Sequence, residues 1–197
     1  MNGVEGFILA GGASSRMGAD KARLRLGGRT LVGRAAEALG AVCASVSLIS
    51  SKPDAADFGL PVFGDVYAGR GALGGLHAAL AHARAPWAAV LSCDLPFASG
   101  ALLGRLASLR APDAEAVAPL QLDGRPQPLC ALYARAACLP PAVELIRSEE
   151  LRPRVLLARL RTRWVAPEEW ADLPGSEHFF LNLNTPDDFA AARRIAE

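Results

Sequence analysis

The sequence lacks a hydrophobic run long enough to cross a bilayer, because its longest apolar stretches fall well short of about 20 residues. It also lacks a basic region ahead of the first apolar stretch, so we expect no secretory signal peptide. With a net charge of +1 and only 6% aromatic residues, it has neither the basic surface nor the stacking side chains typical of nucleic-acid-binding proteins. We therefore expect a protein that binds neither membrane nor nucleic acid.

Cysteine is also scarce, with four residues in all: Cys43, Cys93, Cys130 and Cys138. They form no Cys-x-x-Cys pair, and no histidine accompanies them at metal-ligand spacing. This argues against a zinc site and indicates a reduced, cytoplasmic protein whose cysteines serve as small buried hydrophobes. The 197 residues, 51% of them hydrophobic, suit a single domain spanning 1–197.

The most informative stretch follows the first apolar run. Residues 5–9 predict a short buried strand, residues 31–39 predict a helix, and a loop of small residues joins them. Glycines such as the Gly11-Gly12 pair let backbone N–H groups converge on an anion. Arg16 offers a planar fork of donors and Lys21 a compact charge, and both suit phosphate oxygens. This stretch therefore predicts a binding loop for a triphosphate.

Two better-known phosphate loops fit less well. A Walker A loop needs glycine directly before its lysine and serine or threonine after it, but Ala22 follows Lys21. A Gly-x-Gly-x-x-Gly pattern does occur at residues 69–74, with Asp94 downstream, as in dinucleotide-binding enzymes. That fingerprint should open the first βαβ unit, and here it does not. The P-loop interpretation fails, and the dehydrogenase interpretation lacks its structural context.

Apolar segments alternate with helical ones in the first half of the chain. Strands are predicted over residues 46–49, 61–63 and 87–91, with a helix over 71–83. The unbroken apolar run 87–91 indicates a buried parallel strand. We therefore expect an α/β fold with a twisted, mainly parallel sheet covered on both faces. Ligands bind beyond the carboxyl ends of such strands, which places the phosphate loop and Asp94 in one crevice.

The second half predicts a small β-excursion that could cover a second substrate. Strands over 114–120 and 129–133 are joined by Asp123-Gly124, a strong hairpin signal. The remaining predicted elements are a short strand over 164–166 and helices over 137–149, 153–160 and 186–195.

Asp94 has two interpretations, which the sequence leaves open. It directly follows the strand predicted over 87–91, where a carboxylate can hold Mg²⁺ together with substrate phosphates and waters. It can also make an Asx-type turn or cap a helix predicted over 98–106. The glycine loop, two cations and one carboxylate together indicate phosphoryl or nucleotidyl transfer. No activated serine or cysteine nucleophile is visible, which argues against covalent hydrolase chemistry.

Four motifs follow one another along nearly the whole chain. They are Leu9-Ala10-Gly11-Gly12 with Arg16-Met17-Gly18 and Asp20-Lys21, Ser92-Cys93-Asp94-Leu95-Pro96, Gln127-Pro128-Leu129-Cys130-Ala131-Leu132-Tyr133, and Asn182-Leu183-Asn184-Thr185-Pro186-Asp187-Asp188. In this order they resemble the signature of the molybdenum cofactor guanylyltransferases, the MobA family. The resemblance implies a three-layer α/β/α fold of the nucleotide-diphospho-sugar transferase type. It also implies transfer of GMP from GTP to the terminal phosphate of molybdopterin, with release of pyrophosphate and formation of a guanine dinucleotide cofactor.

The resemblance implies a role for each matching residue. Arg16 and Lys21 would neutralise the triphosphate, Asp65 would contact the nucleoside, and Asp94 would hold Mg²⁺. Catalysis would depend on Arg16, Lys21 and Asp94. The full set implied for nucleotide binding is Leu9, Ala10, Gly11, Gly12, Lys21, Asp65 and Asp94.

Asn182 and Asn184 would lie near the acceptor, molybdopterin, where amides can donate and accept hydrogen bonds. Other proteins of molybdenum cofactor biosynthesis and recipient molybdoenzymes are the partners that the resemblance implies. Simpler interpretations stay open: Asn184 or Thr185 can cap the helix that begins near Pro186, and Asp65 can end a strand in a turn.

The chain departs from the family pattern at two places. Ser50-Ser51 stands where the family usually has asparagine, which leaves one nucleoside contact open, and residues 71–76 replace a Gly-Pro-Leu-Ala-Gly-Leu run.

Two alternative functions also stay open. One is a molybdopterin cytidylyltransferase or another cytidylyl enzyme of this fold, although Gly11-Gly12 resembles the guanylyl branch. The other is a non-catalytic nucleotide-binding assembly partner, although such a protein would need neither Lys21 nor Asp94.

Overall fold

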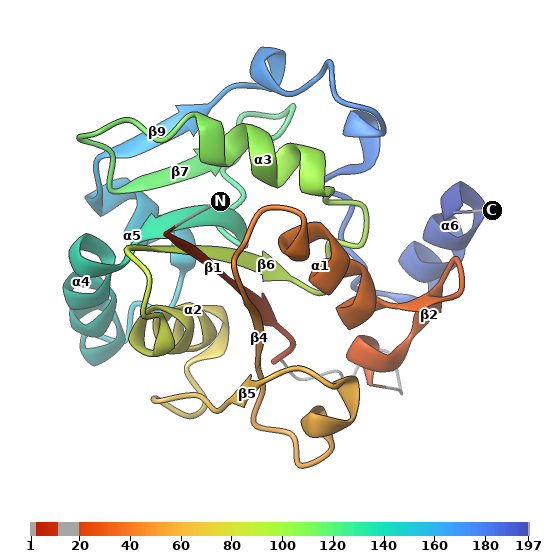
Figure 1. Cartoon of the computed structure of the whole chain (residues 1–197), viewed down its shortest axis with the longest axis horizontal. Coiled ribbons are helices and arrows are strands. Elements are labelled where there is room, and N and C mark those ends of the chain that lie inside the picture. Colours follow the sequence, from red (N-terminus) through yellow and green to blue (C-terminus); the bar gives the residue numbers. More distant parts are fainter. Residues whose placement is uncertain (1–2, 12–19, 197) are drawn as a thin grey trace.

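The computed structural model describes residues 3–11 and 20–196. Seven strands form one central sheet in the order β5-β4-β1-β6-β8-β7-β9 (Figure 1). Neighbouring strands pair in parallel except at β8, which runs antiparallel to β6 and to β7. The strands are β1 (Val4–Leu9), β4 (Val46–Ile49), β5 (Val62–Phe63), β6 (Trp87–Ser92), β7 (Ala116–Pro119), β8 (Cys130–Ala134) and β9 (Thr162–Val165).

Helices cover both faces of the sheet (Figure 1). One face carries α1 (Leu31–Gly40) and α3 (Gly100–Ser108), and the other carries α2 (Gly71–His82), α4 (Arg135–Arg147) and α5 (Pro153–Arg159). Strand β1 contributes to both halves of the core, because Ile8 packs with the first set of helices and Phe7 with the second. The predicted three-layer α/β/α fold with a mainly parallel sheet is confirmed. In the described part of the chain, no helix is both long enough and apolar enough to cross a membrane.

The two strands that we expected to form a small excursion belong instead to the central sheet. β8 lies between β6 and β7, and its neighbouring residues Ala131 and Leu132 are almost fully buried on opposite faces. Helices cover the sheet on both faces here, so the residues of β8 are buried on each face as expected for an interior strand. The predicted turn does form: Gly124 has φ +78° and its N–H donates to the carbonyl of Gln121 at 2.9 Å.

A small hairpin between the phosphate loop and α1 was not predicted. Strands β2 (Arg25–Leu26) and β3 (Arg29–Thr30) pair antiparallel across Gly27 and Gly28, whose φ values are +56° and +78°. Two consecutive residues with positive φ are typical of a type I′ turn, which glycine adopts at no steric cost. The last helix, α6 (Pro186–Ala196), packs beside β2. Short 3₁₀ turns complete the description: η2 (Lys21–Arg23), η3 (Ala55–Phe58), η4 (Pro167–Glu169) and η5 (Ser176–His178).

Candidate active site

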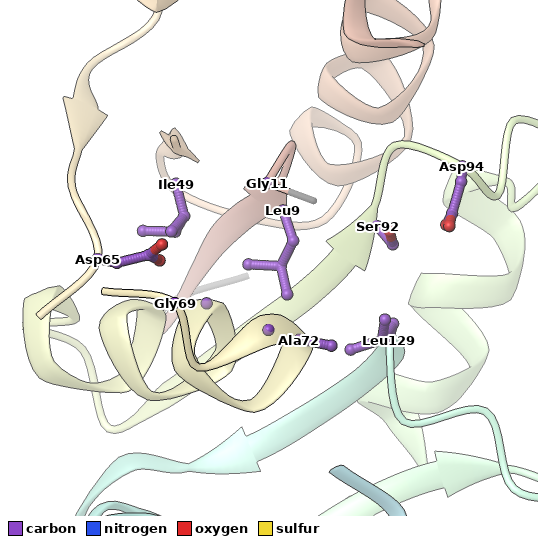
Figure 2. A pocket seen from close by; sticks show the side chains of 11 residues that line it. Leu9, Gly11, Ile49, Asp65, Gly69, Ala72, Ser92, Asp94 and Leu129 are labelled. Atoms are coloured by element: carbon purple, nitrogen blue, oxygen red, sulfur yellow. The ribbon is translucent and has the colours of Figure 1, made fainter. Parts of the chain in front are cut away.

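A pocket of about 540 Å³ opens at the carboxyl ends of three neighbouring parallel strands (Figure 2). The last residues of β1, β4 and β6 all line it, and these are Leu9, Ile49 and Ser92. This is the edge at which ligands bind in open α/β sheets. The complete lining is Leu9, Gly11, Ile49, Asp65, Gly69, Gly71, Ala72, Gly75, Ser92, Asp94 and Leu129.

Two carboxylates stand at opposite ends of this pocket. Figure 2 shows Asp65 beside Ile49 at one end and Asp94 at the other, with Leu9 and Ala72 between them. The N–H of Asp65 donates to the hydroxyl oxygen of Ser51 at 3.5 Å, so the Ser50-Ser51 loop reaches the same end as Asp65. The pocket therefore offers an elongated ligand one acidic group at each end and apolar side chains between.

The beginning of α2 forms one wall of the pocket. Its residues were not among the binding residues predicted from the sequence. Gly71 and Ala72 open the helix and line the pocket together with Gly69. The φ values of +73° at Gly69 and +56° at Gly71 favour glycine, because other residues rarely adopt them. A helix N-terminus with free N–H groups favours a phosphate. The Gly-x-Gly-x-x-Gly pattern at residues 69–74 could have predicted this phosphate-binding helix start. We considered the pattern only as a dinucleotide-binding fingerprint.

The carboxylate of Asp94 is the predicted metal ligand. Its Oδ1 is buried and has no hydrogen-bond partner among the residues that the structure describes. The helix-cap interpretation is wrong, because α3 is capped by Ser99, whose hydroxyl oxygen accepts from the N–H of Leu102 at 3.2 Å. The described residues include no group of three or more metal-binding side chains. A metal ion here would therefore take Asp94 as its protein ligand and fill its other positions with phosphate oxygens and waters.

Lys21 joins the N-terminal loop to the end of the chain. It opens η2, and its ammonium donates to the carbonyl of Leu183 at 2.6 Å and to Oδ1 of Asn184 at 3.4 Å. The N–H of Leu183 in turn donates to the carbonyl of Asp94 at 3.0 Å. The structure thus brings together three parts of the predicted site that are far apart in sequence: the loop lysine, the aspartate predicted to bind a metal and the predicted acceptor segment.

The two asparagines of that segment differ in their contacts. Asn182 donates locally, from Nδ2 to the carbonyl of Phe180 at 3.1 Å, whereas Oδ1 of Asn184 accepts from Lys21. The cap of α6 is Thr185, because its hydroxyl oxygen accepts from the N–H of Asp188 at 3.1 Å. Asp188 accepts from the N–H groups of Asn184 and Thr185, and these hydrogen bonds lower the pKa of its carboxyl. Asn184 therefore does not cap the helix, and its amide faces Lys21.

The first motif is described only in part. Leu9 and Gly11 line the pocket, while Ala10 is 7% exposed, packs in the core and donates its N–H to the carbonyl of Ile49 at 3.2 Å. Gly12 and Arg16 lie outside the described residues.

The cysteine beside the predicted metal ligand is not a nucleophile. Burial, with smaller contributions from the carboxylates of Asp94 and Asp20, raises the pKa of Cys93 to about 12. Its thiol stays protonated at neutral pH and cannot attack. All four cysteines are free, and Cys43 alone among them is not fully buried, as expected for small structural hydrophobes.

Comparison with known proteins agrees with this geometry. A family model described as "MobA-like NTP transferase domain" matches residues 6–164. The chain is 34% identical over 195 residues to a probable molybdenum cofactor guanylyltransferase of Pelotomaculum thermopropionicum, covering 98% of this chain and 93% of that protein. It is 36% identical over 192 residues to a protein of the same name from Chloroflexus aggregans, covering 94% and 91%.

A solved structure has the same fold over almost its whole length. It is molybdopterin-guanine dinucleotide biosynthesis protein A from Archaeoglobus fulgidus, which is 25% identical, covers 97% of both chains and has a TM-score of 0.82. The matched residues include β1, α2, β6 and the Asp94 turn, the elements that build the pocket. The chain therefore belongs to the MobA-like NTP transferase family.

Proposed function

We propose that this protein transfers GMP from GTP to the terminal phosphate of molybdopterin, releasing pyrophosphate and forming a guanine dinucleotide cofactor. One observation carries the proposal: Oδ1 of Asp94, which has no hydrogen-bond partner among the described residues, lies in a pocket that also holds the N-terminus of α2. The segment that touches Asp94 also touches Lys21. A carboxylate, a helix N-terminus and a lysine around one space suit a metal-bound triphosphate better than an uncharged ligand.

The nucleoside would occupy the end of the pocket near Asp65, and the phosphates the end near Asp94. Leu9, Gly11 and the start of α2 line the space between these ends. We assign Ala10 and Gly12 to the same nucleotide-binding loop and Arg16, together with Lys21, to neutralisation of the triphosphate. Mg²⁺ held by Asp94 would offset the negative charge that accumulates on the phosphate oxygens during transfer.

The acceptor would approach along the segment that contains Asn182 and Asn184. Its terminal phosphate is largely dianionic at neutral pH, because its second pKa is near 6. The attacking phosphate oxygen forms a bond to the α-phosphorus of GTP. The bond between that phosphorus and the oxygen that bridges the α- and β-phosphates breaks, and pyrophosphate leaves. No protein base is needed, so the residues act by alignment and by charge neutralisation. Lys21 is suited to this because it contacts Leu183 and Asn184 on the acceptor side.

Nucleotide binding tests this proposal directly. Calorimetric titrations with GTP, CTP and ATP, each with and without Mg²⁺, should show selective binding of GTP that is tighter with the metal. Preference for CTP would assign the protein to the cytidylyl branch. Binding of GTP that is independent of Mg²⁺, without turnover when molybdopterin is added, would favour a non-catalytic assembly partner.

A further inference from the structure

The chain contains only two lysines: one directly follows Asp20 in the sequence, and the other forms an ion pair with the Asp20 carboxylate. The other basic residues among its 21 are arginines. Lys21 follows Asp20 directly in sequence, and Lys52 approaches from the loop after β4, with its Nζ 2.6 Å from Oδ1 of Asp20. The same Oδ1 accepts from the N–H of Ala22 at 3.1 Å and thereby caps η2.

The two lysines have partners of opposite character. Lys52 is paired with a carboxylate, whereas the ammonium of Lys21 donates to a carbonyl and to an amide oxygen, both neutral. Among the described residues, no carboxylate forms an ion pair with Lys21. An ammonium held only by neutral oxygens keeps its full charge for an anion, while an ammonium paired with a carboxylate must first give up that pair.

The Lys52–Asp20 pair is protected enough to persist. The side chains are 34% and 21% exposed, so water and salt screen the pair less than they screen fully exposed pairs on the surface. If Lys52 were absent, Asp20 would keep, among the described residues, a longer ion pair with Arg23, whose Nε lies 4.0 Å from Oδ2. That guanidinium is already shared with Asp54 and Asp57 at 2.8 Å. Much of the negative charge of Asp20 would therefore be left beside Lys21 and beside the expected triphosphate. That carboxylate would repel the phosphates and compete for Lys21.

We propose that Lys52 is a positioning residue for nucleotide binding: it holds and neutralises Asp20, and this keeps Lys21 available to the triphosphate. The inference rests on the proposed function, because it concerns the same nucleotide site. Lys52 lies outside the family motifs. Its proposed role is electrostatic and involves no contact with the nucleotide.

The test is a double-mutant cycle on GTP binding, measured by calorimetry with Mg²⁺ and accompanied by the melting temperature of each variant. Lys52→Met should weaken binding of GTP about tenfold, which corresponds to about 1.4 kcal/mol. Lys52→Arg should stay within about threefold of the wild type, because arginine can also pair with Asp20. Adding Asp20→Asn to Lys52→Met should restore most of the affinity, since asparagine can still cap η2 but carries no charge. Arg105→Met, which removes a cation paired with Asp172 elsewhere, controls for the change in net charge.

Each other outcome contradicts the inference in a recognisable way. If Asp20→Asn fails to restore affinity in the Lys52→Met background, Lys52 contacts the nucleotide itself. If Lys52→Met lowers the melting temperature but leaves GTP affinity unchanged, its role is structural. If the wild-type protein binds no GTP, the proposed function fails, and the inference fails with it.

Discussion

At the scale of single residues, the environment of Asp94 is unusual. A buried carboxylate oxygen without a hydrogen bond is costly unless something absent from the free protein pairs with it. We propose that a cation bound in this pocket is that partner. The N–H of Leu183 donates to the main-chain carbonyl of Asp94 and not to its carboxylate.

Asp94→Asn is therefore expected to separate catalysis from folding. The amide has nearly the same shape but no negative charge, so we expect kcat to fall by about 10²–10³ while the melting temperature stays within a few degrees. Steady-state turnover over a series of Mg²⁺ concentrations measures the first effect and calorimetric melting the second. Asp187→Asn, at an exposed position in the first turn of α6, is the matched control and should leave turnover unchanged. Normal Mg²⁺-dependent turnover in Asp94→Asn would contradict the metal assignment.

His77 should make stability depend on pH. It is 4% exposed, packs edge-on against Tyr67 and has no partner for Nδ1 among the described residues. Burial, and to a smaller extent the charge of His82, lowers the pKa of His77 below its ordinary value of 6.5. Below pH 6.5 the unfolded chain therefore binds a proton that the folded chain does not, and stability falls as pH decreases.

This pH effect can be isolated with one variant. The melting temperature of the wild type should fall between pH 7.5 and pH 5.5, and His77→Leu should show a smaller fall over the same range. His178→Gln, at a half-exposed position, serves as the comparison and should retain the wild-type slope. An identical slope in His77→Leu would show that other groups cause the pH dependence.

At the scale of elements, the contact between α1 and α3 sets a steric limit. A Cβ on Gly100 would lie 2.7 Å from the Cβ of Ala41, a distance that packed carbon atoms do not adopt. Gly104, one turn later on α3, has room, since its Cβ would lie 3.6 Å from Val42. We expect Gly100→Ala to destabilise the fold by about 1–3 kcal/mol. Gly104→Ala should stabilise it by up to about 1 kcal/mol, because alanine favours a helix. Denaturant unfolding of the two variants checks this, and effects of the same sign would contradict the packing described here.

The start of α2 offers a test in which stability and binding move in opposite directions. Ala72→Glu places a negative charge at the helix N-terminus, which should stabilise the helix by about 0.3–1 kcal/mol. The same charge lies in the pocket and should repel the triphosphate, so GTP affinity should fall at least tenfold. Ala72→Gln keeps the size without the charge and should lose less affinity. Equal losses in the two variants would mean that size, not charge, limits the site.

Some of the strands could be predicted from the sequence and others could not. The strands of the first half were predictable because each is a short apolar run bounded by turn residues, as at β4 and β6. The position of β8 between β6 and β7 was not predictable, because strand order depends on pairings between distant segments that local sequence patterns do not encode. The β2–β3 hairpin was not predicted, because each of its strands has only two residues, which is too few to show a periodic pattern.

At the scale of the whole molecule, the site depends on contacts between the two ends of the chain. Lys21 and Leu183 are separated by 162 positions, yet they are joined by a 2.6 Å hydrogen bond. The motifs predicted each residue separately, through its chemistry or through the family resemblance. They could not predict that the acceptor segment would lie against the loop lysine and the Asp94 turn, since these contacts join residues far apart in sequence.

Transfer of the nucleotide itself tests the central claim most directly. The protein is incubated with Mg²⁺, molybdopterin and GTP labelled at the α-phosphate, and the label in the pterin product is compared with the pyrophosphate released. We predict one labelled GMP in the product for each pyrophosphate, with CTP and ATP far less effective and with little transfer by Asp94→Asn. Pyrophosphate release without label in the pterin, or transfer from CTP in preference to GTP, would contradict the account.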